Sequence, residues 1–388
     1  MSFIVAKKKK VKKKGRFKGL IIPLIIGGLF GAVLGIFSAK YFPDGLLSGD
    51  SRIIGFVNFY IYLVLAILGY LLHIIIHEVG HLVFGLLTGY KFVSFRVGSL
   101  TLIREDGKLK TKKFNIPGTA GQCLMMPPEL VDGKYPFVIY NLGGALLNLL
   151  VAFICLYLGM KIKGESLLKA LLVFPSFGGI FAGLTNAIPF KIGGIANDGH
   201  NILSMLKDKE ARRAFHTQLW VNGLQSQGKR IKDMDMEIFY LRENADLTSP
   251  LNTAMVLMRH NYYLDKEDFQ GAQETLDLLV PHIDKLVSLY KFEVNIERMF
   301  LELIGDNRKH FIEDLYDKNI EKYIKVAKFM IGKKRFLMAY EGFYNEDIEK
   351  AREYHDELKD LYHHYPIKGE ADMELMLGEY VKEKLGRQ

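Results

Sequence analysis

The run HEVGH, from His77 to His81, has the residue types and the spacing of a zinc-binding helix. Residues four positions apart share one face of an α-helix, so His77 and His81 can each offer an imidazole nitrogen to the same metal ion. Glu78 would lie beside that ion, where its carboxylate can take a proton from a water molecule. Because H-E-x-x-H also arises by chance, the alternative is that these polar side chains are satisfied within a helix bundle.

The motif lies in an apolar stretch that is long enough to cross a membrane. Of the 388 residues 49% are apolar, and four segments reach the length of about 20 residues that a bilayer demands. They are Leu20–Ala39, Ile53–Leu87, Phe137–Met160 and Leu167–Phe190. HEVGH occupies the C-terminal third of the second segment. Ionisable residues are costly inside a bilayer, which favours a functional role for the motif.

Basic residues predict the orientation of these spans. Residues 7–18 contain nine Lys or Arg and no acid, directly before the first apolar run. A nucleic-acid-binding tail is the competing interpretation, but this position favours a cytoplasmic anchor that attracts anionic lipid, with no nucleic acid as partner. The first run is longer than the core of a signal peptide and lacks a small-x-small cleavage site, so we expect an uncleaved span.

The loop between Tyr90 and Pro136 is rich in Lys and Arg, which places it inside. Both termini and HEVGH would then be on the cytoplasmic side, and the lack of an organelle-targeting signal suits a bacterial plasma membrane. Within this loop, residue types alternate around the turn pair Asp106-Gly107, so we predict a β-hairpin of Val93–Ile103 with Lys108–Phe114. The next segment, GTAGQCLMMPPE, contains Gly and Pro and is expected to be irregular.

The C-terminal residues are rich in charge and predict amphipathic helices with few breakers. Turns are expected near Asp265, Asp306 and Glu346, at intervals of about 40 residues, which fits a short α-solenoid similar to tetratricopeptide-like repeats. A plain helical domain is the alternative. Because helical-repeat surfaces bind peptides and proteins, we expect a cytosolic protein partner for this part.

We therefore predict an all-α polytopic membrane protein with about four transmembrane helices, a small β-hairpin insertion and a C-terminal cytosolic α-helical, solenoid-like domain. The expected domains are a basic N-terminus (1–18), a first transmembrane helix with an external loop (19–52), a membrane core (53–205) with the hairpin at 91–115, and the helical domain (206–388).

A catalytic zinc site usually has three protein ligands and one open position. Asp198, in the segment NDGHNIL after the fourth span, is the candidate for the third ligand, because the topology brings it to the same membrane side as HEVGH. His200 is the rival, being two residues away. Cys123 and Cys155 form no Cys-x-x-Cys pair, so a thiolate site is not expected. A His, His and carboxylate set favours Zn²⁺.

Three segments together resemble the site-2 protease family of intramembrane zinc metalloproteases. HEVGH matches the family's H-E-x-x-H helix, Asn186–His200 looks like its N-x-x-P…D-G segment, and Gly143–Asn148 is similar to its Gly-Pro-x-x-Asn segment. The resemblance covers residues 53–205, and it implies a third ligand at Asp198 and substrate contacts at Asn148 and Asn186. Ala145 stands where the family often has proline, and the spacing before Asp198 is longer than in the common pattern.

The resemblance implies an intramembrane zinc endopeptidase that hydrolyses a peptide bond in or next to a transmembrane segment of a membrane protein or of a membrane-bound signal or pro-peptide. Zinc would polarise the carbonyl, and Glu78 would act as general base. A strand edge of the predicted hairpin could hold the unwound substrate by β-addition. The alternative is a non-catalytic membrane scaffold that binds a membrane partner through the same bundle and the helical tail.

Overall fold

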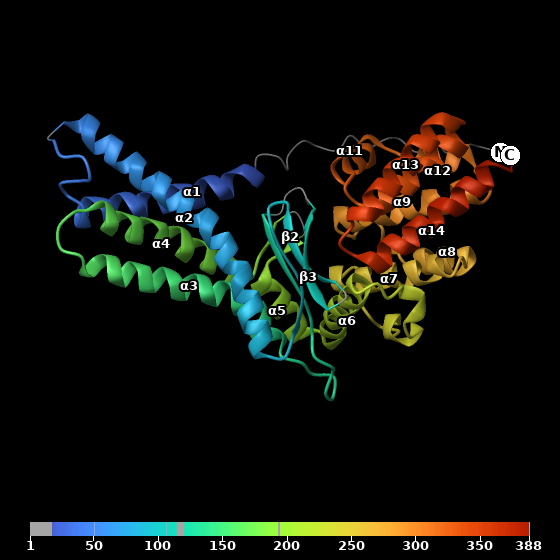
Figure 1. The fold of residues 1–388 in the computed structure, drawn as a ribbon, viewed down its shortest axis with the longest axis horizontal. Coiled ribbons are helices and arrows are strands. Elements are labelled where there is room, and N and C mark those ends of the chain that lie inside the picture. The colour runs from blue at the N-terminus through green and yellow to red at the C-terminus, as the bar shows by residue number, and fades with distance from the viewer. Residues whose placement is uncertain (1–17, 50, 106, 115–119, 193–194, 388) are drawn as a thin grey trace, which may run out of the picture. The chain divides into compact units, whose positions relative to one another are not determined.

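The computed structural model describes residues 18–49, 51–105, 107–114, 120–192 and 195–387. These residues form a mostly helical protein with fourteen α-helices and a four-stranded antiparallel sheet (Figure 1). The basic N-terminal run, the turn residue Asp106 and residues 115–119 lie outside the described part. Contacts divide the chain into two compact units, residues 1–73 with 149–182, and residues 74–148 with 183–388.

Three described helices are long and apolar enough to cross a membrane, namely α2 (Arg52–Leu87), α3 (Phe137–Lys161) and α4 (Leu167–Ala187). They coincide with the second, third and fourth predicted spans. Helix α1 (Lys18–Tyr41) has 24 residues and coincides with the first predicted span. Large apolar side chains such as Leu72 on α2 and Phe153 on α3 are exposed, as expected for surfaces that face lipid.

Small residues allow close helix contacts in the first unit. A Cβ on Gly69 of α2 would lie 2.3 Å from Cα of Pro175 in α4, so the two backbones touch there. Tyr62 stacks on Phe174 with the ring centroids 3.9 Å apart. Backbone approach at small residues and packed aromatic rings are how helices associate where no hydrophobic force drives them together.

The sheet of the second unit has the strand order β3-β2-β1-β4. Its strands are β1 (Lys91–Val97), β2 (Leu100–Glu105), β3 (Lys108–Lys113) and β4 (Gly121–Met126). The predicted pairing across residue 107 is confirmed by β2 and β3, where Leu102 lies opposite Thr111. The single long strand predicted before it is wrong, because Gly98, with φ of 57°, turns the chain between β1 and β2.

The expectation of irregular structure after the hairpin is wrong for residues 121–126. This segment is β4, which pairs with β1, with Cys123 opposite Phe95. The pairing satisfies backbone groups that an irregular buried segment would leave open, and it buries Met125 completely beside Tyr140. Strand β4 also packs against α6 (Lys209–Ser226), which follows α5 (Asp198–Lys207) and the short strands β5 (Lys191–Ile192) and β6 (Ile195–Ala196).

The C-terminal part, coloured from yellow to red in Figure 1, consists of short helices around one apolar core. They are α7 (Pro250–Asp265), α8 (Phe269–Asp277), α9 (Ser288–Ile304), α10 (Lys309–Leu315), α11 (Lys318–Val326), α12 (Ile331–Ala339), α13 (Ile348–His364) and α14 (Lys368–Leu385). Short turns of 3₁₀-helix are η1 (Ile231–Asp233), η2 (Met236–Phe239) and η3 (Val280–His282), and Tyr340–Tyr344 forms the π-helical turn η4.

The helix-turn-helix junctions lie where the sequence predicts turns. Each junction has a left-handed residue before the second helix, namely Glu267, Asn307 and Glu346, which are 40 and 39 residues apart. A left-handed residue ends one helix, and the next residue, Asp268 and Asp347 in two cases, caps the following helix. The recurrence of one turn geometry at this interval is what a helix-pair repeat requires.

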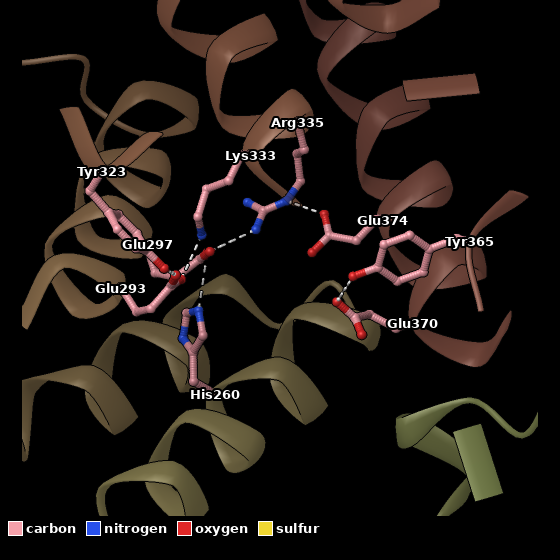
Figure 2. Close-up of polar contacts among 9 residues, drawn as sticks. All are labelled: His260, Glu293, Glu297, Tyr323, Lys333, Arg335, Tyr365, Glu370 and Glu374. Carbon is pink, nitrogen blue, oxygen red and sulfur yellow. Dashed lines mark hydrogen bonds and ion pairs between the residues drawn. The ribbon is translucent and has the colours of Figure 1, made fainter. Parts of the chain in front are cut away.

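A buried ionic cluster joins α7, α9, α12 and α14 (Figure 2). Arg335, 1% exposed, lies between Glu297 and Glu374, with nitrogen–oxygen distances of 2.9 Å and 2.6 Å. Lys333 pairs with Glu293 at 2.6 Å. Removing one member of such a buried pair leaves an uncompensated charge, so these contacts favour one arrangement of the helices.

Glu370 lies beside the cluster and should make the stability of the protein depend on pH (Figure 2). Its carboxylate accepts a hydrogen bond from the Tyr365 hydroxyl at 3.1 Å. Burial, together with the charge of Glu374, raises the pKa of Glu370 to about 7. An unfolded glutamate titrates near pH ~4.3, so the folded chain binds this proton more tightly and loses stability as pH rises from ~4.3 to ~7.

In the wild-type protein we expect the free energy of unfolding to fall by on the order of 2 kcal/mol between pH 5 and pH 8, and Glu370→Gln should remove this fall. Thermal unfolding of the full-length protein followed by circular dichroism measures this difference. Glu383→Gln, at an exposed glutamate of the same helix, should keep the wild-type decline. An equal decline in wild type and Glu370→Gln would contradict the assignment.

Candidate metal centre

Three side chains of the second unit, from two helices, converge on one point. His77 and His81 come from α2, one turn apart, and Asp198 is the first residue of α5. His77 Nε2 is 3.0 Å from Asp198 Oδ2 and 3.1 Å from His81 Nε2, and the third side of the triangle, His81 Nε2 to Asp198 Oδ2, is 3.5 Å. Among the described residues, these three form the one set of His, Cys, Asp or Glu side chains whose ligand atoms lie close enough together to hold one ion.

The size of this triangle fits zinc. Bonds of about 2.0–2.1 Å in tetrahedral geometry place the ligand atoms about 3.3–3.4 Å from one another. The three observed separations, 3.0, 3.1 and 3.5 Å, bracket that value. Three ligand atoms from two imidazoles and one carboxylate would leave the fourth position of a tetrahedral ion for another ligand such as water.

A hydrogen bond outside the triangle orients His81, and Asn148 lies beside His77. His81 Nδ1 is 2.9 Å from the Tyr140 carbonyl oxygen, so it donates its proton there and leaves Nε2 free to bind a metal. The amide nitrogen of Asn148, a fully buried side chain of α3, is 3.4 Å from His77 Nδ1. A His77 that binds a metal through Nε2 carries its proton on Nδ1, so Asn148 can accept that proton only with its amide turned to present the oxygen. The substrate contact predicted for Asn148 stays a prediction, and the structure places this residue beside the His77 ring.

The segment GGALLN fits closely around the α2 motif. A Cβ on Gly143 would come within 2.7 Å of the Gly80 carbonyl oxygen, so α2 and α3 touch backbone to backbone. A Cβ on Gly144 would lie 2.4 Å from the His77 ring. Gly144 therefore makes the space that the histidine occupies, and Gly143 lets the two helix backbones approach.

Asn197 positions Asp198, and sequence reasoning missed it. It is the N-cap of α5, where its Oδ1 accepts from the backbone N–H of His200 at 2.9 Å and from that of Phe190 at 3.1 Å. Its Nδ2 donates to the carbonyl oxygens of Thr185 and Ile188 at 2.7 and 2.6 Å. One amide thus ties the end of α4 to the start of α5. The N-cap preference for asparagine before a helix was the available signal.

We expect Asn197→Ala to weaken zinc binding by roughly 10- to 100-fold, because residues that orient ligands have effects of this size. Competition with a calibrated chelator on the purified protein measures the affinity. Asn201→Ala, four residues further along α5, is the matched control and should bind zinc as wild type does. Unchanged affinity in Asn197→Ala would show that α5 holds Asp198 without this cap.

Glu78 lies between the metal triangle and the strand β4. A Cβ on Gly121 would be 2.7 Å from Glu78 Cγ, and the backbone N–H of Cys123 bonds to the Glu78 side chain. Burial, with the charge of Glu78, raises the pKa of the Cys123 thiol to about 12. The thiol therefore stays protonated at neutral pH, so Glu78, and not Cys123, is the candidate proton acceptor beside this strand.

The other predicted residues lie apart from the triangle or beside it. His200 Nδ1 is 3.0 Å from Ser204 Oγ on its own helix, so the structure brings Asp198, and not its rival His200, to the two histidines. Asn186 lies in the last turn of α4, partly buried, and the backbone of that turn contacts Gly199. No protein family model, curated protein or solved structure matches the chain.

Proposed function

We propose that this chain is an intramembrane zinc endopeptidase of the site-2 protease type. The observation that supports this most strongly is the triangle of His77, His81 and Asp198 at zinc-like separations, with Glu78 next to it. The motif lies on a helix long and apolar enough to cross a membrane. A hydrolytic site at this place would act on a peptide bond in or next to a transmembrane segment of a membrane protein or membrane-bound peptide.

The chain's own groups account for the proton transfers. A zinc ion held by the three ligands would polarise the scissile carbonyl and acidify water. Glu78 accepts the proton of the attacking water and then delivers it to the nitrogen of the leaving amine as the C–N bond breaks. His81 stays oriented by the Tyr140 carbonyl. Asn148 lies beside the His77 ring and acts as a positioning residue when its amide oxygen is turned to accept the Nδ1 proton.

The substrate must be extended before it is cut, because a helix ties its carbonyls in internal hydrogen bonds. Strand β4 is an edge of the sheet and passes beside Glu78, whereas β3 is the opposite edge. A substrate segment that adds to β4 near Gly121 would bring its backbone to Glu78. The strand that we propose to hold the substrate is therefore β4, and not a strand of the hairpin.

We expect Gly121→Ala to lower the cleavage rate by roughly 100-fold, since the added methyl group displaces the Glu78 side chain and such misplacement costs about this much. Zinc content should not change. Gly55→Ala, where a Cβ meets nothing within 4 Å, is the matched control and should cleave normally. Normal cleavage by Gly121→Ala would contradict both the binding of substrate along β4 and the role of Glu78 as the base beside it.

The alternative function is a membrane scaffold without catalysis, which would use the same helices and the C-terminal part for binding. Labelling of new protein N-termini in membranes from cells that produce wild type or Glu78→Gln separates the two. A protease yields termini near transmembrane segments in the wild-type sample alone. Identical sets of termini would support the scaffold. We propose that the protein lies in a bacterial plasma membrane with both termini in the cytoplasm.

A further inference from the structure

A groove of about 630 Å³ lies between the C-terminal part of α1 and the first turns of α2, within the first compact unit. Its volume is inside the range of about 300–1,000 Å³ for ligand pockets. The lining is largely apolar and includes small residues and phenylalanine rings, namely Gly35, Ala39, Phe42, Gly55, Phe56 and Phe59. An apolar groove of this size suits the hydrocarbon part of a ligand.

The polar side chains of the lining, apart from Arg52, already have partners in the protein. Ser38 Oγ donates to a carbonyl oxygen of its own helix at 2.9 Å. Asn58 bonds to both backbone groups of Leu47 at 3.0 Å, and Tyr62 accepts from another backbone N–H of the same loop at 3.2 Å. These bonds fix the loop between α1 and α2 and leave Arg52 as the polar group that can recognise a ligand.

Arg52 is the one charged residue of the lining, and it is exposed, so a ligand can reach its guanidinium. Within the described part of the chain it takes part in no hydrogen bond or ion pair. It is the first residue of α2, a helix long and apolar enough to cross a membrane, so it lies where the apolar run begins, at the level of lipid headgroups. Ile53 and Phe56 beside it are 74% and 66% exposed, which gives this turn of α2 an apolar outer surface.

We propose that this groove binds the phosphate and one acyl chain of an anionic phospholipid. The planar guanidinium of Arg52 donates its N–H groups to the phosphate oxygens, and the acyl chain lies against Gly55 and the rings of Phe56 and Phe59. A cation at the headgroup level next to an apolar groove matches such an amphiphile, whereas an apolar transmembrane helix of a partner offers no counter-charge to Arg52. The proposal does not depend on the metal centre or on catalysis.

The test is native mass spectrometry of the full-length protein, delipidated in detergent and titrated with phosphatidylglycerol or phosphatidylcholine that have the same acyl chains. The two lipids differ in net charge, because the choline group neutralises the phosphate. We expect wild type to bind phosphatidylglycerol roughly tenfold more tightly and Arg52→Gln to lose this preference, as loss of one charge-assisted hydrogen bond predicts. Lys40→Gln, at an exposed lysine near the end of α1 and outside the lining, is the matched control and should keep the preference.

A second variant, Gly55→Leu, tests the apolar part of the groove. A Cβ at position 55 meets nothing within 4 Å, so the added side chain can occupy the groove without displacing the backbone. It should weaken the binding of both lipids by roughly tenfold, because it displaces part of the acyl chain.

The proposal is overturned if wild type does not prefer phosphatidylglycerol, if Arg52→Gln keeps the preference, or if Gly55→Leu binds both lipids as wild type does. Dimers of the chain that persist without lipid and dissociate in Gly55→Leu would also overturn it, since they would assign the groove to a second copy.

Discussion

Glu78→Gln is expected to retain zinc and to lose cleavage by roughly 10²–10⁴-fold, the range for removal of a general base. The three ligand atoms belong to His77, His81 and Asp198, so an amide at position 78 leaves the triangle intact. The amide has nearly the shape of the carboxylate but does not take up the proton of water. Metal content by mass spectrometry and cleavage of a transmembrane model peptide in vesicles measure the two effects on one preparation.

Glu129→Gln is the control for this substitution, since that glutamate is exposed and follows β4 by a few residues. It should match wild type in both measurements. Retained cleavage by Glu78→Gln would remove Glu78 from the reaction. Loss of zinc together with cleavage would instead make Glu78 part of the metal site.

Asp198→Ala is expected to lose zinc and cleavage, whereas His200→Ala keeps both. Asp198 supplies the carboxylate corner of the triangle, and losing a ligand should cost more than the roughly 100-fold seen for residues that only orient one. His200 is turned toward Ser204 on its own helix. Chelator competition gives the zinc affinities, and the vesicle assay gives the rates.

The pair of variants discriminates between two assignments of the third ligand. Zinc loss in His200→Ala with retention in Asp198→Ala would require α5 to rotate by roughly half a turn from the position that Asn197 fixes, because the two residues are two positions apart. Zinc loss in neither variant would mean that two histidines and a group outside the triangle hold the metal.

The sequence predicted the parts that follow from local rules. The spacing of four residues places His77 and His81 on one face, and span counting brings Asp198 to the same side. Apolar length located the helices α2, α3 and α4, and turn chemistry located the junctions that end at Glu267, Asn307 and Glu346. Each of these features depends on residues close together in the chain or on length alone.

The parts that were missed depend on contacts distant in the chain. Residues 121–126 have no strong alternation, and they become a strand because β1 offers a partner edge. Asn148 meets His77 across 71 positions, a contact that no spacing rule shows. Arg335, Glu297 and Glu374 look like surface charges in an amphipathic pattern, yet packing buries them together. Burial of charge is decided by tertiary structure and cannot be recognised from single residues.

The most direct test of the central claim is the metal content of the purified wild-type protein beside His77→Ala. The geometry of the site predicts about one zinc ion per wild-type chain, since one ligand triangle is present in the described residues. His77→Ala, which removes one corner and leaves the helix in place, should contain almost none. A folded wild-type protein without zinc, or equal zinc in both proteins, would contradict the metal centre and leave the membrane scaffold as the function to pursue.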